Sequence, residues 1–197
     1  LALVKQGRLD SASTHFGEAV RLDGESIEAA YNLGKCRVLL GQFEAATVTL
    51  TELVNRSPAH AAAHLYLGKA AIGLQQPAAA IKNLRESLRL RPQSLSAASL
   101  LAWVLATDAE AHLRNGEEAI RLVEPIAGQK DRQQPSVLDA LAAAYAEVGR
   151  FDEAFVTAQN ARDRARSFGD TNLAAEIAGR ITLYQARQPY RSGKSPD

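Results

Sequence analysis

Two histidines, His60 and His64, stand four residues apart, which is the spacing that places two metal ligands on one face of a helix. A zinc site takes three or four protein ligands, and neither a HExxH glutamate nor a third ligand follows nearby in the sequence. His60 also directly precedes the expected start of a helix at residue 61. We therefore predict packed or capping histidines and no metal site.

The other residue types that carry catalysis are isolated. Cys36 is the single cysteine, which excludes an intramolecular disulfide, and we interpret it as a small buried hydrophobic residue. His15 and His112 belong to no motif, and the sequence contains no GxSxG, P-loop or GxGxxG pattern. Glu117 and Glu118 suit the first turn of a helix, where carboxylates interact favourably with the helix dipole. The sequence therefore predicts a non-catalytic protein without a cofactor.

Composition indicates which scaffold holds these residues. The 197 residues are 46% hydrophobic and 23% charged, with a formal net charge of +1. Abundant alanine and leucine favour helices, so we predict an all-α fold. The small net charge gives no general attraction to nucleic acid or an anionic membrane, and no apolar run reaches the roughly 20 residues that cross a bilayer. We expect a soluble segment, cytoplasmic or periplasmic, with no nucleic-acid partner and no direct membrane insertion.

The strongest pattern is an internal repeat of fixed period. The stretch NLGKCRVLLGQFEAA begins at residue 32 and YLGKAAIGLQQPAAA begins at residue 66, so Leu-Gly-Lys and a later alanine recur at one offset. Glycine costs about 1 kcal/mol relative to alanine inside a helix, so its recurrence indicates a packing role. We expect Gly34 and Gly68 to face Ala46 and Ala80 across pairs of closely packed antiparallel helices.

A Leu-Gly pair, an aromatic residue, an alanine and a closing proline, in this order and at this period, resemble the tetratricopeptide repeat. The resemblance covers residues 1 to about 168 and implies an α-solenoid of helix-turn-helix repeats. The expected repeats are residues 1–26 (partial), 27–60, 61–94, 95–134 (with an insertion) and 135–168.

The ends of the stack and the insertion are also expected from the sequence. The insertion should form a short ordered loop over residues 108–114. Apolar residues at 173, 177, 181 and 184 predict a capping helix over 171–187, with Arg180 and Arg187 among its polar positions. We therefore expect a single solenoid over residues 1–188 and a disordered tail over 189–197.

The resemblance also implies where a ligand would lie, because positions 2, 5, 6, 9, 12 and 13 of each repeat's first helix line a concave groove in tetratricopeptide proteins. Aromatic anchors and two lysines at these positions suit a peptide. The candidate groove residues are Tyr31, Asn32, Lys35, Leu65, Tyr66, Lys69, Ser99 and Trp103.

The lysines have a more specific interpretation. Lys35 and Lys69 occupy the same position in successive repeats, so their side chains are expected to meet at one anion, either an acidic side chain or a terminal carboxylate. Solvated lysines without a ligand are the alternative. Family members that clamp a C-terminal carboxylate use a set of lysines, arginines and asparagines, of which only Asn32 is in place here, so the resemblance does not extend to that clamp.

We therefore expect a non-catalytic scaffold that binds a peptide or partner segment in this groove. Two alternatives stay open. The C-terminal part also resembles the end of bacterial proteins built from many such repeats, some with a membrane-embedded glycosyltransferase upstream; the chain would then be a substrate-recognition or accessory segment of a larger enzyme. The other alternative is a self-associating scaffold that forms a homo-oligomer. Because the chain begins at Leu1 and contains no methionine, we interpret it as part of a longer protein.

Overall fold

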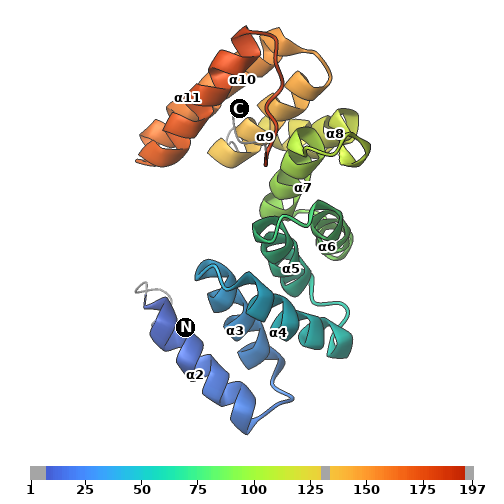
Figure 1. The fold of residues 1–197 in the computed structure, drawn as a ribbon, viewed down its shortest axis with the longest axis vertical. Coiled ribbons are helices and arrows are strands. Elements are labelled where there is room, and N and C mark those ends of the chain that lie inside the picture. Colours follow the sequence, from blue (N-terminus) through green and yellow to red (C-terminus); the bar gives the residue numbers. More distant parts are fainter. Residues whose placement is uncertain (1–7, 130–133, 194–197) are drawn as a thin grey trace. The chain divides into compact units, whose positions relative to one another are not determined.

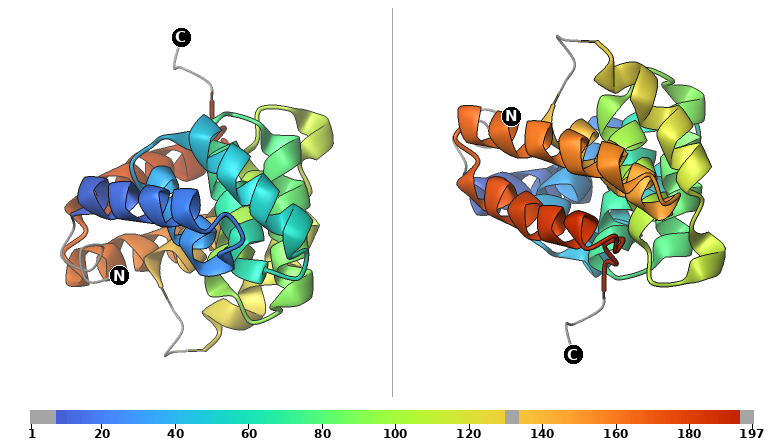
Figure 2. Two further views of the ribbon diagram at one scale, coloured as in Figure 1. Left: turned by 90° about the horizontal axis from the view of Figure 1, so that it is seen from below. Right: turned by 90° about the horizontal axis from the view of Figure 1, so that it is seen from above.

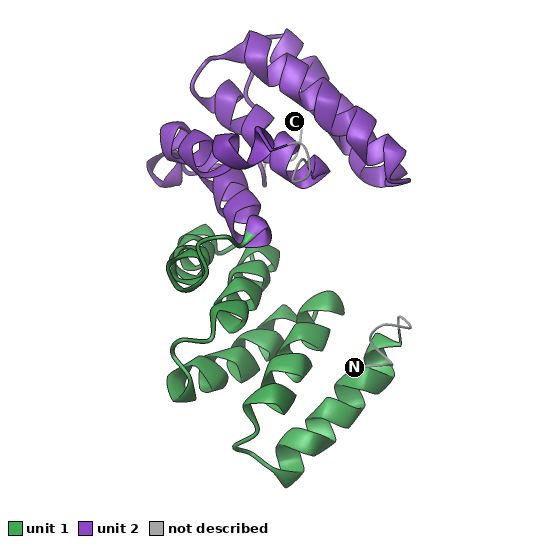
Figure 3. Ribbon diagram, turned by 180° about the vertical axis from the view of Figure 1, so that it is seen from behind, with its two compact units in different colours: residues 1–94 green, residues 95–197 purple. Residues whose placement is uncertain are grey.

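The computed structural model describes residues 8–129 and 134–193. Over these ranges the chain forms ten α-helices and one 3-10 helix, and none of the described residues lies in a strand (Figure 1). The all-α prediction is therefore confirmed. The chain divides into two compact units, residues 1–94 and residues 95–197, each of which is described by itself (Figure 3). A single solenoid over residues 1–188 stays a prediction.

Unit 1 contains two complete helical hairpins preceded by one helix. Helices α3 and α4 form the first hairpin and α5 and α6 the second, and consecutive helices pack on one another. Each hairpin lies within one of the expected repeats. The bounds are α2 (Leu9–Leu22), α3 (Ile27–Leu39), α4 (Phe43–Arg56), α5 (Ala61–Gly73) and α6 (Pro77–Leu90).

Unit 2 contains two further hairpins and a last helix that lies beside α10 (Figure 2). A 3-10 turn interrupts the connection between its first two helices, where the sequence predicts an ordered loop. The bounds are α7 (Leu95–Thr107), η1 (Ala111–Leu113), α8 (Gly116–Ala127), α9 (Pro135–Glu147), α10 (Phe151–Ser167) and α11 (Thr171–Gln185).

Side-chain caps begin four of these helices by accepting a hydrogen bond from an otherwise unsatisfied backbone N–H group. Ser26 caps α3, His60 caps α5, Asn115 caps α8 and Asp170 caps α11. Asn115 accepts from the Glu118 amide at 3.0 Å and its Nδ2 donates to the Glu118 carboxylate at 3.3 Å, so the two side chains hold each other at the start of α8. The helix bounds thus follow from local residue chemistry as well as from the repeat.

The repeated glycines lie at the closest approach within each hairpin of unit 1. A Cβ atom added to Gly34 would lie 2.5 Å from the Leu50 side chain, and one added to Gly68 would lie 2.7 Å from Leu84. Both leucines are fully buried. The packing role of the glycines is as predicted, but their opposing side chains are these leucines, which stand four residues after the expected alanines.

The backbone conformation of the turn within each hairpin of unit 1 also recurs from one repeat to the next. Gly41 has φ +74°, and Gln75, which occupies the same place in the next repeat, has φ +54°. This left-handed backbone suits glycine and strains a residue with a Cβ atom. The repeat therefore keeps its turn geometry even where the sequence has lost the glycine.

The C-terminal region differs from the prediction in two respects. Arg180, expected among the polar positions of the last helix, is only 6% exposed. Within residues 189–193, expected to be disordered, Tyr190 and Ser192 contact α7 and Arg191 contacts α9. Residues 194–197 of the expected tail, and residues 1–7 of the first partial repeat, lie outside the described residues.

The glycine–leucine packing predicts opposite effects for two glycine-to-alanine substitutions in unit 1. Gly34→Ala places a methyl group against Leu50, whereas Gly17→Ala, also within a helix, places it where nothing lies within 4 Å. Both changes gain the same helix propensity, so the difference between their free energies of unfolding measures the packing alone. We expect Gly34→Ala to be less stable than Gly17→Ala by about 1–3 kcal/mol in urea unfolding. Equal stabilities would show that the hairpin does not close on this glycine.

Candidate functional site

The predicted groove residues lie on three helices. Tyr31, Asn32 and Lys35 belong to α3, and Leu65, Tyr66 and Lys69 belong to α5, both in unit 1. Ser99 and Trp103 belong to α7 in unit 2. The two parts of the predicted site are therefore described separately.

Aromatic rings gather on the α3–α5 face of unit 1. The ring centroids of Tyr31 and Tyr66 lie 5.9 Å apart with an interplanar angle of 73°, an edge-to-face contact. The imidazole of His60 lies 5.0 Å from the Tyr31 ring. Both tyrosines are partly buried, and burial raises the pKa of each phenol. The rings thus form a fixed apolar surface of which only part reaches the solvent.

A lysine lies beside one of these rings, with a second lysine near enough to influence its charge. The Nζ atom of Lys69 is 5.0 Å from the centroid of Tyr66, within range of a cation–π interaction. Burial lowers the pKa of Lys69, and the positive charge of Lys35 lowers it further, so the two ammonium groups repel one another. Burial also lowers the pKa of His60, and the charge of Arg91 acts in the same direction. We call Tyr31, Lys35, His60, Tyr66 and Lys69 the basic–aromatic patch.

Of the three other predicted residues in these helices, two are buried and one is partly buried. Asn32 is 5% exposed, and its Nδ2 donates to the Glu28 carbonyl at 2.9 Å. Ser99 is 7% exposed. Leu65 is partly buried. A direct role for these three in binding stays a prediction, and the arrangement favours a structural one for Asn32 and Ser99.

In unit 2, Trp103 belongs to a cluster around one buried arginine. The guanidinium of Arg180 lies 4.9 Å from the Trp103 ring and 5.5 Å from the Tyr190 ring. These two rings are 5.6 Å apart. Arg180 from α11 donates two hydrogen bonds, at 3.0 and 2.8 Å, to the carboxylate of Asp139 on α9.

The Arg180–Asp139 pair is almost fully buried, with Asp139 5% exposed. Burial raises the pKa of Asp139 to about 6, although the positive charge of Arg180 opposes the shift. The two hydrogen bonds that Arg180 donates, one to each carboxylate oxygen, fit the ionised form of Asp139. Such a pair fixes the position of α11 on α9, because losing Asp139 would leave the buried Arg180 charge with only the exposed carboxylate of Glu176, 3.7 Å away on the same helix.

The two histidines at metal-ligand spacing have separate structural contacts. The Nδ1 atom of His60 accepts from the Ala63 amide at 3.0 Å. The ring nitrogens of His64 lie 3.3 Å from Asn83 Oδ1 and 3.0 Å from the Pro58 carbonyl. Within residues 8–129 and 134–193 no group of three His, Cys, Asp or Glu side chains has the arrangement of a metal site.

A search of the same described residues finds no helix of the length and hydrophobicity needed to span a membrane.

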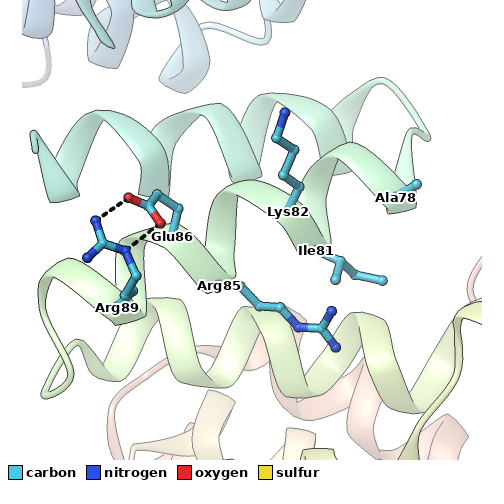
Figure 4. Close-up of a pocket in the computed structure, with 6 residues that line it drawn as sticks. All are labelled: Ala78, Ile81, Lys82, Arg85, Glu86 and Arg89. Atoms are coloured by element: carbon cyan, nitrogen blue, oxygen red, sulfur yellow. Dashed lines mark hydrogen bonds and ion pairs between the residues drawn. The ribbon is translucent and has the colours of Figure 1, made fainter. Parts of the chain in front are cut away.

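One shallow pocket of about 520 Å³ lies on the surface of α6 (Figure 4). Glu86 and Arg89 in its lining pair through two hydrogen bonds, at 2.8 and 2.7 Å. None of the predicted groove residues contributes to it, and Figure 4 shows Lys82 and Arg85 pointing in different directions, away from the Glu86–Arg89 pair, so its polar groups do not meet at one point. We therefore do not assign a ligand to it. Its lining residues are Ala78, Ile81, Lys82, Arg85, Glu86 and Arg89.

Sequence reasoning missed part of both clusters. His60 was expected as a cap or packed residue; it is a cap, and its other ring face also joins the basic–aromatic patch. Arg180 lies three residues after Ile177 and four before Tyr184, both buried, so its place on the inner face of α11 is visible in the helical spacing. The contact of Tyr190 with Trp103 and Arg180 could not be predicted, because the sequence around Tyr190 is polar and shows no pattern of buried residues.

Comparison with known proteins agrees with this architecture. The family model of the tetratricopeptide repeat matches residues 3–65. The fold is similar to that of a thermophilic tetratricopeptide-repeat protein of Thermus thermophilus, with a TM-score of 0.67 and 24% identity over 90% of this chain and 93% of that one. No curated protein sequence matches the chain.

Two further solved structures have similar folds. One is a mutant of MamA, with a TM-score of 0.65 and 21% identity over 83% of this chain and 91% of that one. The other is a tetratricopeptide-repeat protein from Parabacteroides merdae, with a TM-score of 0.62 and 16% identity over 94% of this chain and 78% of that one. At these identities the similarity concerns the fold.

The buried ion pair predicts a large effect of one charge-removing substitution. Asp139→Asn removes the buried carboxylate that binds Arg180 and leaves the guanidinium only the exposed carboxylate of Glu176, 3.7 Å away, so the free energy of unfolding should fall by about 3 kcal/mol. The matched control is Asp152→Asn, because the Asp152 side chain is 94% exposed and lies 3.8 Å from Arg187. That change should leave stability almost unaltered. Urea unfolding at pH 7.5 measures both, and equal effects would mean that the buried pair does not hold α11 in place.

Proposed function

We propose that this chain, a tetratricopeptide-repeat protein, acts as a non-catalytic scaffold that binds an acidic peptide segment at the basic–aromatic patch of unit 1. Tetratricopeptide repeats generally mediate protein–protein interactions, and the fold is typically non-catalytic. The observation that carries the proposal is the position of Lys69, whose ammonium group lies over the Tyr66 ring of the Tyr31–Tyr66 pair and close enough to Lys35 to feel its positive charge.

The charge of the patch supports an anionic ligand. No ion pair joins Lys35 or Lys69 to a carboxylate among the described residues of the chain. Burial without a counter-charge disfavours the protonated form of Lys69, and the neighbouring lysine disfavours it further. A carboxylate placed between the two ammonium groups would remove both penalties, whereas a neutral or cationic ligand would remove neither.

The rings support a ligand with apolar groups beside its carboxylate. Tyr31 and Tyr66 are held by each other and, for Tyr31, by the His60 ring, so little side-chain entropy is lost when a ligand packs on them. Rigid aromatic anchors next to a charged contact are typical of peptide recognition. The ligand class that fits is a peptide with an acidic side chain, or a terminal carboxylate, flanked by apolar residues.

Loss of either lysine should weaken peptide binding. Peptides are first selected against the whole chain from a random library, and the best binder is measured by fluorescence anisotropy against Lys35→Ala and Lys69→Ala. A charge-assisted hydrogen bond contributes about 1.5–3 kcal/mol, so each change should raise Kd roughly ten- to a hundredfold. Raised salt should weaken binding to the unaltered chain more than binding to either variant.

The control is Lys82→Ala, which removes an exposed lysine of α6 that lies outside the patch. It should leave Kd unchanged. Affinity should also fall as pH rises through the lowered pKa of Lys69, at a lower pH than for a fully exposed lysine, because the ammonium form binds the carboxylate. Affinity that is indifferent to both patch lysines would overturn the anion site and leave the scaffold assignment to be tested on other surfaces.

A further inference from the structure

The chain after α11 turns back and runs along α9 and α7 of unit 2 (Figure 1). The Tyr190 ring packs on Trp103, with centroids 5.6 Å apart. The Arg191 guanidinium donates to the Ala106 carbonyl at 3.3 Å and lies 2.6 Å from the carboxylate of Glu147. Three consecutive residues, Tyr190–Ser192, therefore each contact the same surface of the unit.

The contacted residues are groove positions of their repeats. Counted from Leu95, Trp103 is at position 9 and Ala106 and Thr107 are at positions 12 and 13 of the fourth repeat; Glu147 is at position 13 of the fifth, counted from Pro135. These are the positions expected to line a peptide-binding face. We call Trp103, Ala106, Thr107, Glu147 and Arg180 the unit 2 groove.

The groove offers a distinct partner to each residue of the segment. The Trp103 face and the Arg180 guanidinium hold an aromatic ring, and Asp139 fixes Arg180 in that position. The Glu147 carboxylate, only 15% exposed, takes a cation.

Backbone groups at the end of α7 complete the recognition. The Thr107 carbonyl accepts from the Ser192 amide at 2.8 Å, and the Ala106 carbonyl accepts from Arg191. The last carbonyls of a helix have no partner within the helix, so they are available to an extended segment. On the α7 side these contacts use only backbone carbonyls, so a segment of another protein could occupy the same positions.

We propose that Tyr190–Ser192 acts as an intramolecular ligand of the unit 2 groove, and that a partner protein segment with an aromatic residue directly followed by arginine binds there in its place. The chemistry of the groove selects this pattern, because the aromatic site and the carboxylate are occupied by adjacent residues. Among the described residues only one of the segment's contacts with α7 is a backbone–backbone hydrogen bond, and the others are made by the side chains of Tyr190, Arg191 and Ser192, so a partner with the same side chains could replace them. The inference concerns unit 2 alone and is independent of the lysines of unit 1.

The test supplies the segment as a free peptide. A fluorescent peptide with the sequence of residues 188–193, QPYRSG, is titrated with the whole chain and with the double variant Tyr190→Ala/Arg191→Ala, whose own segment has lost its anchors. A short tether gives the attached segment an effective concentration in the millimolar range, so the unaltered chain should bind the free peptide at least about tenfold more weakly than the variant. A control peptide with alanine in place of the arginine should bind neither.

Two further measurements keep the result interpretable. Arg187→Ala removes an exposed arginine of the same region that contacts Asp152 rather than the groove, and it should bind the peptide as weakly as the unaltered chain. In the unaltered chain, millimolar free peptide should speed hydrogen–deuterium exchange over residues 188–193, which requires no variant to fold.

Two results would overturn the proposal. One is a folded double variant that fails to bind the peptide, which would make the segment only a strap that stabilises the last repeats. The other is exchange over residues 188–193 that free peptide leaves unchanged.

Discussion

Each hairpin of unit 1 closes where a glycine lies under a buried leucine, and the placement of the surface residues depends on this contact. A helix turns about 100° per residue, so the residue after the glycine points well away from the hairpin interior. That residue is Lys35 in one repeat and Lys69 in the next. The close packing of backbone on leucine thus fixes the orientation of both lysines, and the repeat period places them on neighbouring helices. The basic–aromatic patch is a consequence of the same spacing that builds the core.

The two units treat positive charge differently on the same helical framework. In unit 1 Lys69 lies beside Tyr66 and is repelled by Lys35, and both lysines are partly exposed. In unit 2 the positive charge of Arg180 is buried near the rings of Trp103 and Tyr190 and paired with Asp139. Fold similarity alone therefore says little about ligand choice, since each unit sets its own electrostatics through a few side chains. The proposals for the two surfaces accordingly call for ligands of opposite charge.

The helical framework was predictable because it rests on local spacing. The repeated glycines, the capping residue Asn115 and the position of the insertion are all visible within short stretches of sequence. The side chains that oppose the glycines stand one helical turn after the predicted alanines. The repeat period does not show which of two residues on the inner face of the second helix lies opposite the glycine. The Asp139–Arg180 pair and the contact of Tyr190 with Trp103 each join residues far apart in the chain, and only the tertiary structure brings them together. A polar C-terminal stretch has the same composition whether it is solvated or docked.

Glu147 gives the insertion a connection that its sequence does not suggest. Its carboxylate receives Arg114, which follows the 3-10 turn of the inserted loop, at 2.8 Å, and Arg191 of the C-terminal segment at 2.6 Å. Two cations that share one anion are thermodynamically linked, because each alters the electrostatic free energy of the other's contact by an equal amount. The inserted loop and the C-terminal segment lie far apart in the sequence, and the stability of each one's contact with Glu147 therefore depends on the other's contact with the same carboxylate. The insertion that interrupts the repeat thus contacts the same carboxylate as the end of the described chain.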